Sequence, residues 1–325
     1  MEQAADNPNA AAAAAIATAA PGLATNGSDH AGATVGAPSE PRRAWFRHLL
    51  KFRLFSGEQP KISPHAVVDE KAEIHESVEI GPFCVIGPDV KIGPGCKLLN
   101  NVTILGHTTI GRDNIFFPNA VIGAAPQDLK YRGAPTQLEI GDGNVFREAV
   151  TVHCGTEKGG GITRVGSSNL LMINSHLGHD VHLGSRCVIS NNVMIAGHVV
   201  IGNNVSMMGL VGIHHFVSIG DYAYLGGAAR IHHDVPPFVK VDGEDKIRAL
   251  NTIGLKRAGF TDDDIQALKD AVRKIWFGRK KTFSQSLAEF DLMNGINPRV
   301  KELVEFLRRR DLGKHGRYLE SLRTS

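Results

Sequence analysis

The 325-residue sequence lacks several features that would place it in common protein classes. No apolar run approaches the roughly 18 residues of a membrane-spanning helix, so an integral membrane protein is excluded. The four cysteines show no CxxC spacing, which argues against a zinc ribbon or a dense disulfide framework. A formal net charge of +3 is too small to indicate a nucleic-acid partner. Aromatic residues make up only 6%, whereas there are 36 glycines, which favours many tight turns around a narrow aliphatic core.

The N-terminal region differs in composition from the rest of the chain. Residues 1–41 are rich in Ala, Gly, Pro and Ser and contain no Lys or Arg, so they lack the basic start of a secretory signal. We expect a disordered low-complexity tail there. Residues 42–58 form a basic amphipathic segment. It predicts either peripheral contact with an anionic membrane through residues 42–55 or a short helix that caps the following domain.

A six-residue repeat begins at Ile62. Every sixth residue is apolar, eleven times in succession as far as Ile122. The register resumes at Ile140 and, after the glycine-rich stretch GTEKGGG, at Val165, and it continues to Ile231. Neither a helix nor a flat strand has a period of six, whereas a parallel β-solenoid has one short strand and one turn per hexad. Three hexads make one triangular coil, so the sequence predicts nearly nine coils.

These repeats resemble the hexapeptide-repeat family, and the resemblance implies a left-handed parallel β-helix. We therefore expect a mainly β fold with a β-helix domain over 59–250 and a small α-helical domain over 251–325. Helix starts are predicted by capping residues at Thr261 and Thr282 and by the pair Asn297-Pro298, and a last short helix by Gly316. The helical domain is rich in Lys and Arg, which suits an acidic partner.

Histidines recur at the spacing of one coil. Residues 18 apart should lie on adjacent coils, about 4.8 Å from one another. One predicted column contains His179, Gly197, His215 and His233, and the column beside it contains Asp180, His198, Phe216 and Asp234. The sequence therefore predicts an edge with several imidazoles, a carboxylate and a vacant glycine that exposes a backbone N–H. This combination favours an acid–base site.

Two further features suggest how a substrate binds. Asn191, Gly209 and Gly227 should stack on another face as a shallow groove for an extended acyl chain. Prisms of this type commonly pair around a threefold axis. We therefore expect a homotrimer in which the histidine edge of one subunit faces this groove of its neighbour. The interruption between Ile122 and Ile140 is a polar insertion that could build part of the site.

Longer motifs make the resemblance more specific. They are IGPFCVIGP, QDLKYRGAPT, GTEKGGGITRVGSSNLLMINSHLGHD, DVPPFV and NTIGLKRAGF. From about residue 60 to 325, the chain resembles the UDP-N-acetylglucosamine O-acyltransferase family, which carries out the first step of lipid A synthesis. The resemblance implies transfer of a 3-hydroxyacyl group from acyl carrier protein to the sugar 3-hydroxyl, with no cofactor and no metal. It also implies the cytoplasm of a Gram-negative-type bacterium, with a plant organelle as the alternative.

The resemblance also implies roles for individual residues. His179 matches the general base, the Gly197 N–H an oxyanion donor, and Asp180 a residue that orients the imidazole. Gly227 matches the position that limits acyl-chain length. Expected substrate-binding residues are Gln127, Asp128, Lys130, His176, His198, His214 and His215, with Asn251 and Arg257 on the nucleotide side. The chain departs from the family pattern at His215, which replaces Gln, at Ile253, which replaces Glu, and at Ala258, which replaces Arg.

Three alternatives remain at this stage. Some hexapeptide-repeat trimers bind zinc through histidines, as in the carbonic anhydrase-like branch, and His179 and His215 are two coils apart. Sister enzymes acylate a 3-amino sugar nucleotide instead of a 3-hydroxyl. A non-catalytic scaffold is the third alternative, and it predicts that replacing His179 has no biochemical effect.

Overall fold

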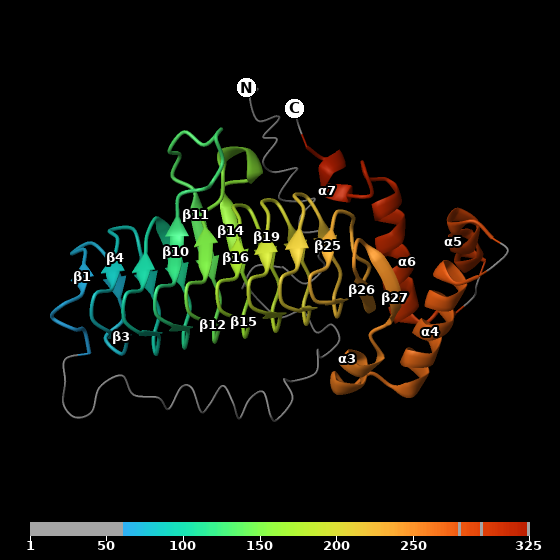
Figure 1. Ribbon diagram of the computed structural model, residues 1–325, viewed down its shortest axis with the longest axis horizontal. Coiled ribbons are helices and arrows are strands. Elements are labelled where there is room, and N and C mark those ends of the chain that lie inside the picture. The colour runs from blue at the N-terminus through green and yellow to red at the C-terminus, as the bar shows by residue number, and fades with distance from the viewer. Residues whose placement is uncertain (1–60, 279–280, 293–294, 324–325) are drawn as a thin grey trace, which may run out of the picture.

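The computed structural model describes residues 61–278, 281–292 and 295–323 (Figure 1). The predictions made for residues 1–41 and 42–58 lie outside these ranges. A solenoid of short strands forms the long axis, and helices gather at its C-terminal end (Figure 1). Within the described ranges, no helix is both long enough and apolar enough to cross a membrane.

The solenoid has three sheets, and the strands within each sheet run parallel except for the last strand of the third. The first sheet contains nine strands: β1 Val67–Val68, β4 Val85–Ile86, β7 Thr103–Ile104, β10 Val121–Ala124, β13 Thr151–His153, β16 His176–Leu177, β19 Met194–Ile195, β22 Gly212–Ile213 and β25 Arg230–Ile231. The second contains eight: β2 Glu73–Ile74, β5 Lys91–Ile92, β8 His107–Ile110, β11 Gln137–Ile140, β14 Ile162–Val165, β17 His182–Leu183, β20 Val200–Ile201 and β23 Ser218–Ile219. The third contains ten: β3 Glu79–Ile80, β6 Lys97–Leu98, β9 Ile115–Phe116, β12 Val145–Phe146, β15 Leu170–Leu171, β18 Val188–Ile189, β21 Ser206–Met207, β24 Tyr224–Leu225, β26 Val239–Asp242 and β27 Lys246–Leu250.

The hexad explains this architecture. The second residue of each two-residue strand points inward, as Ile80, Leu98 and Phe116 do, and these three are fully buried. Phe116 stacks on Phe146 with ring centroids 4.7 Å apart. Stacking of such residues produces one continuous hydrophobic core along the axis. The predicted left-handed parallel β-helix is confirmed.

Pairing follows the predicted 18-residue register except at two insertions and at the last coil, where Tyr224 pairs with Lys240, 16 residues on. His176 pairs with Met194, and Met194 pairs with Gly212. In contrast, Val121 pairs with Thr151, and Thr151 pairs with His176, because residues are inserted after β10 and after β13. Both insertions lie where the chain passes from the first sheet to the second, so they project from the same edge of the prism.

The solenoid ends in an antiparallel hairpin that the sequence analysis did not anticipate. Val239 pairs with Leu250 across β26 and β27, so the third sheet continues past the last coil. The helices that follow are α3 Thr252–Arg257, α4 Asp262–Trp276, α5 Phe283–Asp291, α6 Pro298–Asp311 and α7 Tyr318–Ser321. The side chains of Thr261, Thr282 and Asn297 cap α4, α5 and α6, which confirms the predicted helix starts.

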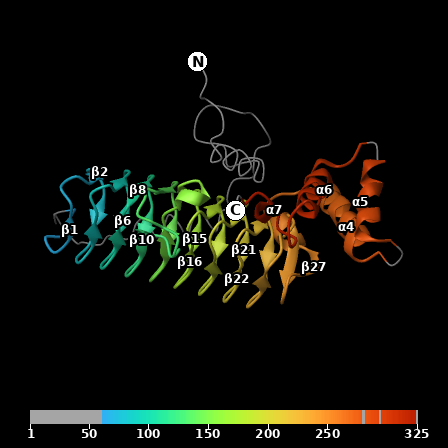
Figure 2. The ribbon, with the colours of Figure 1, turned by 90° about the horizontal axis from the view of Figure 1, so that it is seen from above.

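The C-terminal segment returns to the solenoid. The backbone N–H of Tyr318 donates to the Asp234 carboxylate at 2.8 Å, and the Asp234 N–H donates to the Gly316 carbonyl at 2.8 Å. Both views show α7 between the last coils of the solenoid and α6 (Figures 1 and 2). The last helix therefore packs on the edge that carries the two insertions.

Candidate active site

The histidine edge is the corner where the chain passes from the first sheet to the second. Its turns follow β16, β19 and β22, and they carry three residue pairs: His179-Asp180, Gly197-His198 and His215-Phe216. The second residue of each pair has positive φ, as at Asp180 (59°) and His198 (61°). Because the turns have the same conformation on these three coils, the side chains form two columns, as predicted. The predicted fourth members, His233 and Asp234, do not continue them, because the turn after β25 is two residues shorter and Ile219 pairs with Val235.

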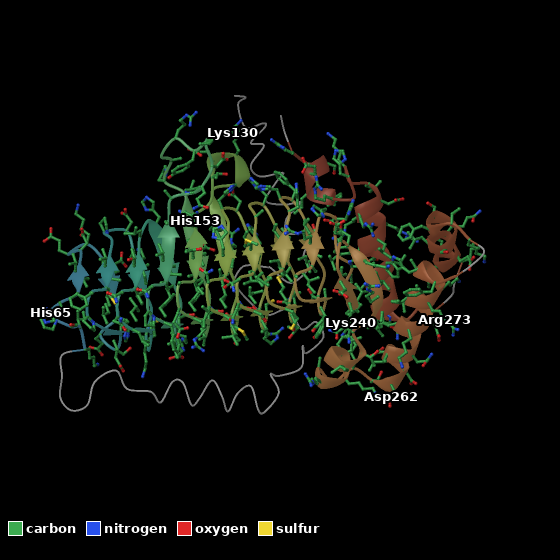
Figure 3. All side chains as sticks on the ribbon, in the orientation of Figure 1. His65, Lys130, His153, Lys240, Asp262 and Arg273 are labelled. Atoms are coloured by element: carbon green, nitrogen blue, oxygen red, sulfur yellow. The ribbon has the colours of Figure 1, made fainter. Side chains whose placement is uncertain are left out.

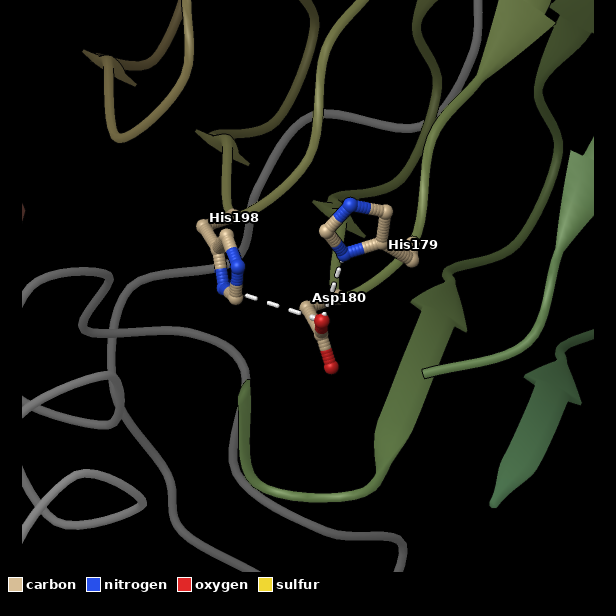
Figure 4. A group of neighbouring side chains, drawn as sticks. All are labelled: His179, Asp180 and His198. Atoms are coloured by element: carbon tan, nitrogen blue, oxygen red, sulfur yellow. Dashed lines mark hydrogen bonds and ion pairs between the residues drawn. The ribbon is translucent and has the colours of Figure 1, made fainter. Parts of the chain in front are cut away.

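A buried carboxylate holds the imidazole of His179. The His179 Nδ1–H donates to Asp180 Oδ2 at 2.8 Å, and only 10% of the His179 side chain and 1% of the Asp180 side chain are exposed (Figure 4). Thr156 donates to the same carboxylate through its hydroxyl at 2.6 Å and its backbone N–H at 2.8 Å. Asp180 therefore accepts three hydrogen bonds, and it fixes the tautomer that leaves His179 Nε2 free to accept a proton.

His198 lies on the other side of Asp180. Its Nδ1 is 3.7 Å from Asp180 Oδ2, and its ring meets that of His179 edge-on with centroids 5.0 Å apart (Figure 4). The next side chain in the column, Phe216, stacks on His198 at 4.5 Å with an interplanar angle of 4°. Burial lowers the pKa of His198 to about 4, so this imidazole is neutral at pH 7.

Gly197 provides the space beside the base. A Cβ at this position would lie 2.5–2.9 Å from three ring atoms of His179, so any side chain would displace the imidazole. Within the described residues, the Gly197 N–H donates no hydrogen bond. The base and a free backbone donor thus lie on adjacent coils, which is the arrangement that acyl transfer through an oxyanion needs.

The first insertion, residues 125–136 between β10 and β11, projects beside this edge (Figure 3). Asp128 accepts from the Lys130 N–H at 2.9 Å, which lowers the pKa of its carboxyl, and His179 and His198 lie within electrostatic reach of it. Gln127 and Lys130 are exposed on the same loop. The loop therefore presents a carboxylate, an amide and an ammonium group to solvent near the base.

Of the other predicted site histidines, His176 and His214 lie next to this edge, and His215 lies on it. His176 points outward from β16 and is hydrogen-bonded to the Thr151 hydroxyl at 2.8 Å. His214 is exposed at the end of β22, with its Nδ1 3.1 Å from the His215 carbonyl. His215 is exposed in the His179 column, where burial of part of its ring and the neighbouring His214 and His179 lower its pKa.

The predicted glycine column exists at the opposite end of the first sheet, in the turns that precede β19, β22 and β25. A Cβ at Gly209 would lie 3.4 Å from the Asn191 carbonyl, and one at Gly227 would lie 3.7 Å from the Gly209 carbonyl. Exposed Met194 and Leu210 flank the column. The result is a strip of bare backbone between apolar side chains.

Asn251 and Arg257 lie on the helical side of the molecule. Asn251 is buried and caps α3: its side chain accepts from the Gly254 N–H and donates to the Tyr222 carbonyl at 2.9 Å. Arg257 ends the same helix. Figure 1 shows α3 at the end of the solenoid, away from β16. The structure therefore does not bring these two residues together with the histidine edge of the same chain.

The structure adds three residues that sequence reasoning did not single out. Thr156 binds the Asp180 carboxylate, the Thr163 hydroxyl accepts from the Asp180 N–H at 2.8 Å, and a Cβ at Gly159 would lie within 2.3 Å of that carboxyl. Thr156 and Gly159 belong to the second insertion, which contains the 3-10 helix η1 Glu157–Gly159. Thr163 lies on β14, directly after this insertion. The glycine-rich interruption GTEKGGG was the available signal.

The zinc alternative requires His179 and His215 to share a site, and this geometry does not favour it. Among the described residues, the one group of three candidate ligands whose atoms lie within 4.8 Å of one another is His179, Asp180 and His198, without His215. The lone pairs of Asp180 that would face an ion already accept from Thr156 and His179. Fitting an ion would require breaking the contacts that orient His179.

Comparison with known proteins first defines the class. Residues 71–106, 89–124 and 162–197 match the bacterial transferase hexapeptide family (six repeats), and residues 234–315 match domain 2 of UDP N-acetylglucosamine O-acyltransferase. The chain thus combines the repeats of the hexapeptide transferases with the C-terminal domain of the UDP N-acetylglucosamine O-acyltransferases.

Close relatives then identify the family. An acyl-[acyl-carrier-protein]–UDP-N-acetylglucosamine O-acyltransferase of Anaeromyxobacter sp. is 43% identical over 206 residues, which are 63% of this chain and 80% of that protein. The structure of the UDP-N-acetylglucosamine O-acyltransferase of Moraxella catarrhalis matches with a TM-score of 0.74 and 40% identity, covering 77% of this chain and 97% of that chain. LpxA of Acinetobacter baumannii matches with a TM-score of 0.73 and 39% identity over 77% and 97%. The chain belongs to the UDP-N-acetylglucosamine O-acyltransferase family.

Proposed function

We propose that this protein transfers a 3-hydroxyacyl group from acyl carrier protein to the 3-hydroxyl of UDP-N-acetylglucosamine, the first step of lipid A biosynthesis. Membership of the family supports the reaction, because the relatives are named as O-acyltransferases of UDP-N-acetylglucosamine, one of them with an acyl carrier protein as donor. The observation that carries the proposal is the buried Asp180–His179 pair beside the free N–H of Gly197. No cofactor is required, since a thioester is already an activated acyl donor.

His179 is the proposed general base. Its Nε2 takes the proton from the sugar 3-hydroxyl as the oxygen attacks the thioester carbonyl carbon, and the hydrogen bond to Asp180 stabilises the imidazolium that forms. The Gly197 N–H is the proposed donor to the oxyanion of the tetrahedral intermediate. When the C–S bond breaks, the imidazolium returns the proton to the departing thiolate. The products are the ester and free acyl carrier protein.

Substrate binding is assigned to the surroundings of the pair. We assign the glucosamine and acyl contacts to Gln127, Asp128, Lys130, His176, His198, His214 and His215, and those to the nucleotide to Asn251 and Arg257. The distance of α3 from the histidine edge of its own chain supports a site that is completed by a second subunit of a homotrimer. The column of Asn191, Gly209 and Gly227 would then bind the acyl chain against the neighbouring subunit. Sedimentation at equilibrium tests the trimer.

Acyl transfer with wild type, His179→Ala and the control His107→Ala tests the function. We expect wild type and His107→Ala to turn over equally, since His107 is an exposed histidine on β8, and His179→Ala to lose at least about a hundredfold in kcat. Equal turnover in all three would remove His179 from its role. Turnover of wild type with a 3-amino sugar nucleotide but not with the 3-hydroxyl would assign the protein to the amine-acylating sister enzymes.

A further inference from the structure

The C-terminal segment, residues 316–323, contacts the last coil of the solenoid on the histidine edge. Tyr318 and Gly316 bind Asp234, which lies on the coil after Phe216 and accepts from the Ser218 N–H, and the Arg317 Nη1 donates to the His232 carbonyl at 2.8 Å. Only 3% of Asp234 and 9% of Arg317 are exposed. The segment is therefore firmly anchored on the solenoid, although more than 80 residues separate it in sequence from the residues that it binds.

One side chain of this segment reaches the column that contains Phe216 and His198. The guanidinium of Arg323 lies over the ring of Phe216, 5.5 Å from the ring centroid. The same guanidinium forms an ion pair with the Glu320 carboxylate at 3.5 Å. Phe216 in turn stacks on His198, which lies against Asp180 and His179. Three successive contacts thus connect the C-terminus with the Asp180–His179 pair.

We propose that Arg323 is a positioning residue for the active site: through Phe216 it holds the ring of His198 flat and shielded beside the Asp180–His179 pair. The inference rests on the proposed function only for its kinetic consequence. A cation over the face of an aromatic ring is attracted by the ring quadrupole, so Arg323 restrains Phe216. Because a nearly parallel stack at 4.5 Å leaves His198 little freedom, fixing Phe216 fixes His198.

The shielding has a chemical consequence. The groups facing His198 are Asp180, His179, His215, Asp128 and the Phe216 ring, and burial is the largest contribution to its low pKa. When Phe216 moves away, water reaches the imidazole, and its pKa rises toward the ordinary value of about 6.5. Protonated His198 would then compete with His179 for Asp180 at mildly acidic pH.

The test compares Arg323→Gln, Phe216→Leu and the double variant, with Lys301→Gln as a control that removes an exposed charge from α6. We expect Arg323→Gln to lower kcat about threefold. Phe216→Leu should lower kcat more and move the acidic limb of the pH–rate profile upward. The double variant should be no slower than Phe216→Leu alone, and Arg323→Lys and Phe216→Tyr should retain most activity.

A second measurement does not depend on turnover. Carbethoxylation of histidines by diethyl pyrocarbonate, read by peptide mass spectrometry, should be about threefold faster at His198 in Arg323→Gln and Phe216→Leu than in wild type, with exposed His75 unchanged. Unchanged reactivity of His198 in both variants would overturn the inference even if wild type proved inactive as an acyltransferase. A raised KM with multiplicative effects in the double variant would instead make Arg323 a direct substrate contact, which also overturns it.

Discussion

The coils before residue 125 and the coils after residue 136 contain the same hexad and the same buried core, but their edges differ. Each region has a His–Asp pair. On the early coils His107 and Asp89 are 3.8 Å apart, with 45% and 53% of their side chains exposed. On the later coils His179 and Asp180 are 2.8 Å apart, with 10% and 1% exposed. The same residue types in the same fold therefore differ in the chemistry that they can perform. The difference comes from the insertions that cover the later edge.

The largest expected effect contrasts two glycines. Gly197→Ala should lower kcat by about a thousandfold, because its methyl group would occupy the space of the His179 ring and disturb the oxyanion donor. Gly87→Ala on an early coil should be neutral, since a Cβ there meets Leu105 at an ordinary 3.6 Å. Steady-state kinetics with circular dichroism as a folding check measures both. Comparable activities would show that the vacant site is not part of the catalytic machinery.

The two His–Asp pairs provide the second comparison. Asp180→Asn should lower kcat about a hundredfold, because an amide that faces His179 favours the tautomer with Nε2 protonated, which cannot accept the substrate proton. Asp89→Asn should leave kcat unchanged, since an exposed pair at 3.8 Å contributes little. The measurement is kcat for both variants at pH 8. A normal rate for Asp180→Asn would contradict the orienting role of the carboxylate.

A smaller effect is expected at the glycine column. Gly227→Met should fold normally, because a Cβ there meets only ordinary contacts, and its side chain should project into the proposed acyl groove. We expect the preference between a longer and a shorter 3-hydroxyacyl donor to shift about tenfold toward the shorter one. Competition between two acyl carrier proteins, read by mass spectrometry of the product, measures the ratio. An unchanged ratio of the two products would show that the acyl chain does not bind in this groove.

The smallest expected effect concerns stability. His182 is buried on β17, and burial lowers its pKa to about 4. The unfolded chain, with a pKa of about 6.5, binds the proton first, so the free energy of unfolding falls as the pH drops from about 6.5 toward 4. Between pH 7 and 6 this histidine should contribute a loss of about 1 kcal/mol or less. Urea unfolding of wild type and His182→Leu should show a shallower pH dependence in the variant, and equal slopes would contradict this.

The sequence predicts the periodic part of the molecule well. A side chain every sixth position determines the coil, and the coil determines which residues stack, so the neighbours His179 and Gly197 follow from counting. The same counting places His176 and His182 on strands of two different sheets, away from the edge itself. The capped helix starts are local signals and were also readable.

The rest of the fold and of the site depends on contacts that the six-residue repeat does not predict. The support of Asp180 by Thr156 crosses an insertion, and the clamp of Tyr318 on Asp234 joins residues 84 positions apart. The hairpin of β26 and β27 interrupts the repeat with antiparallel pairing. None of these has a spacing rule, so only the folded chain reveals which side chains meet.

The coil also imposes a unit of length on the proposed groove. Since Asn191, Gly209 and Gly227 come from successive coils, a blocking side chain can be moved along the groove only in steps of about 4.8 Å, roughly four methylene groups. Relatives that share this architecture should therefore differ in preferred acyl length by discrete increments rather than by a continuous range. The length of the acyl chain in the product would then depend on which coil carries the bulky residue.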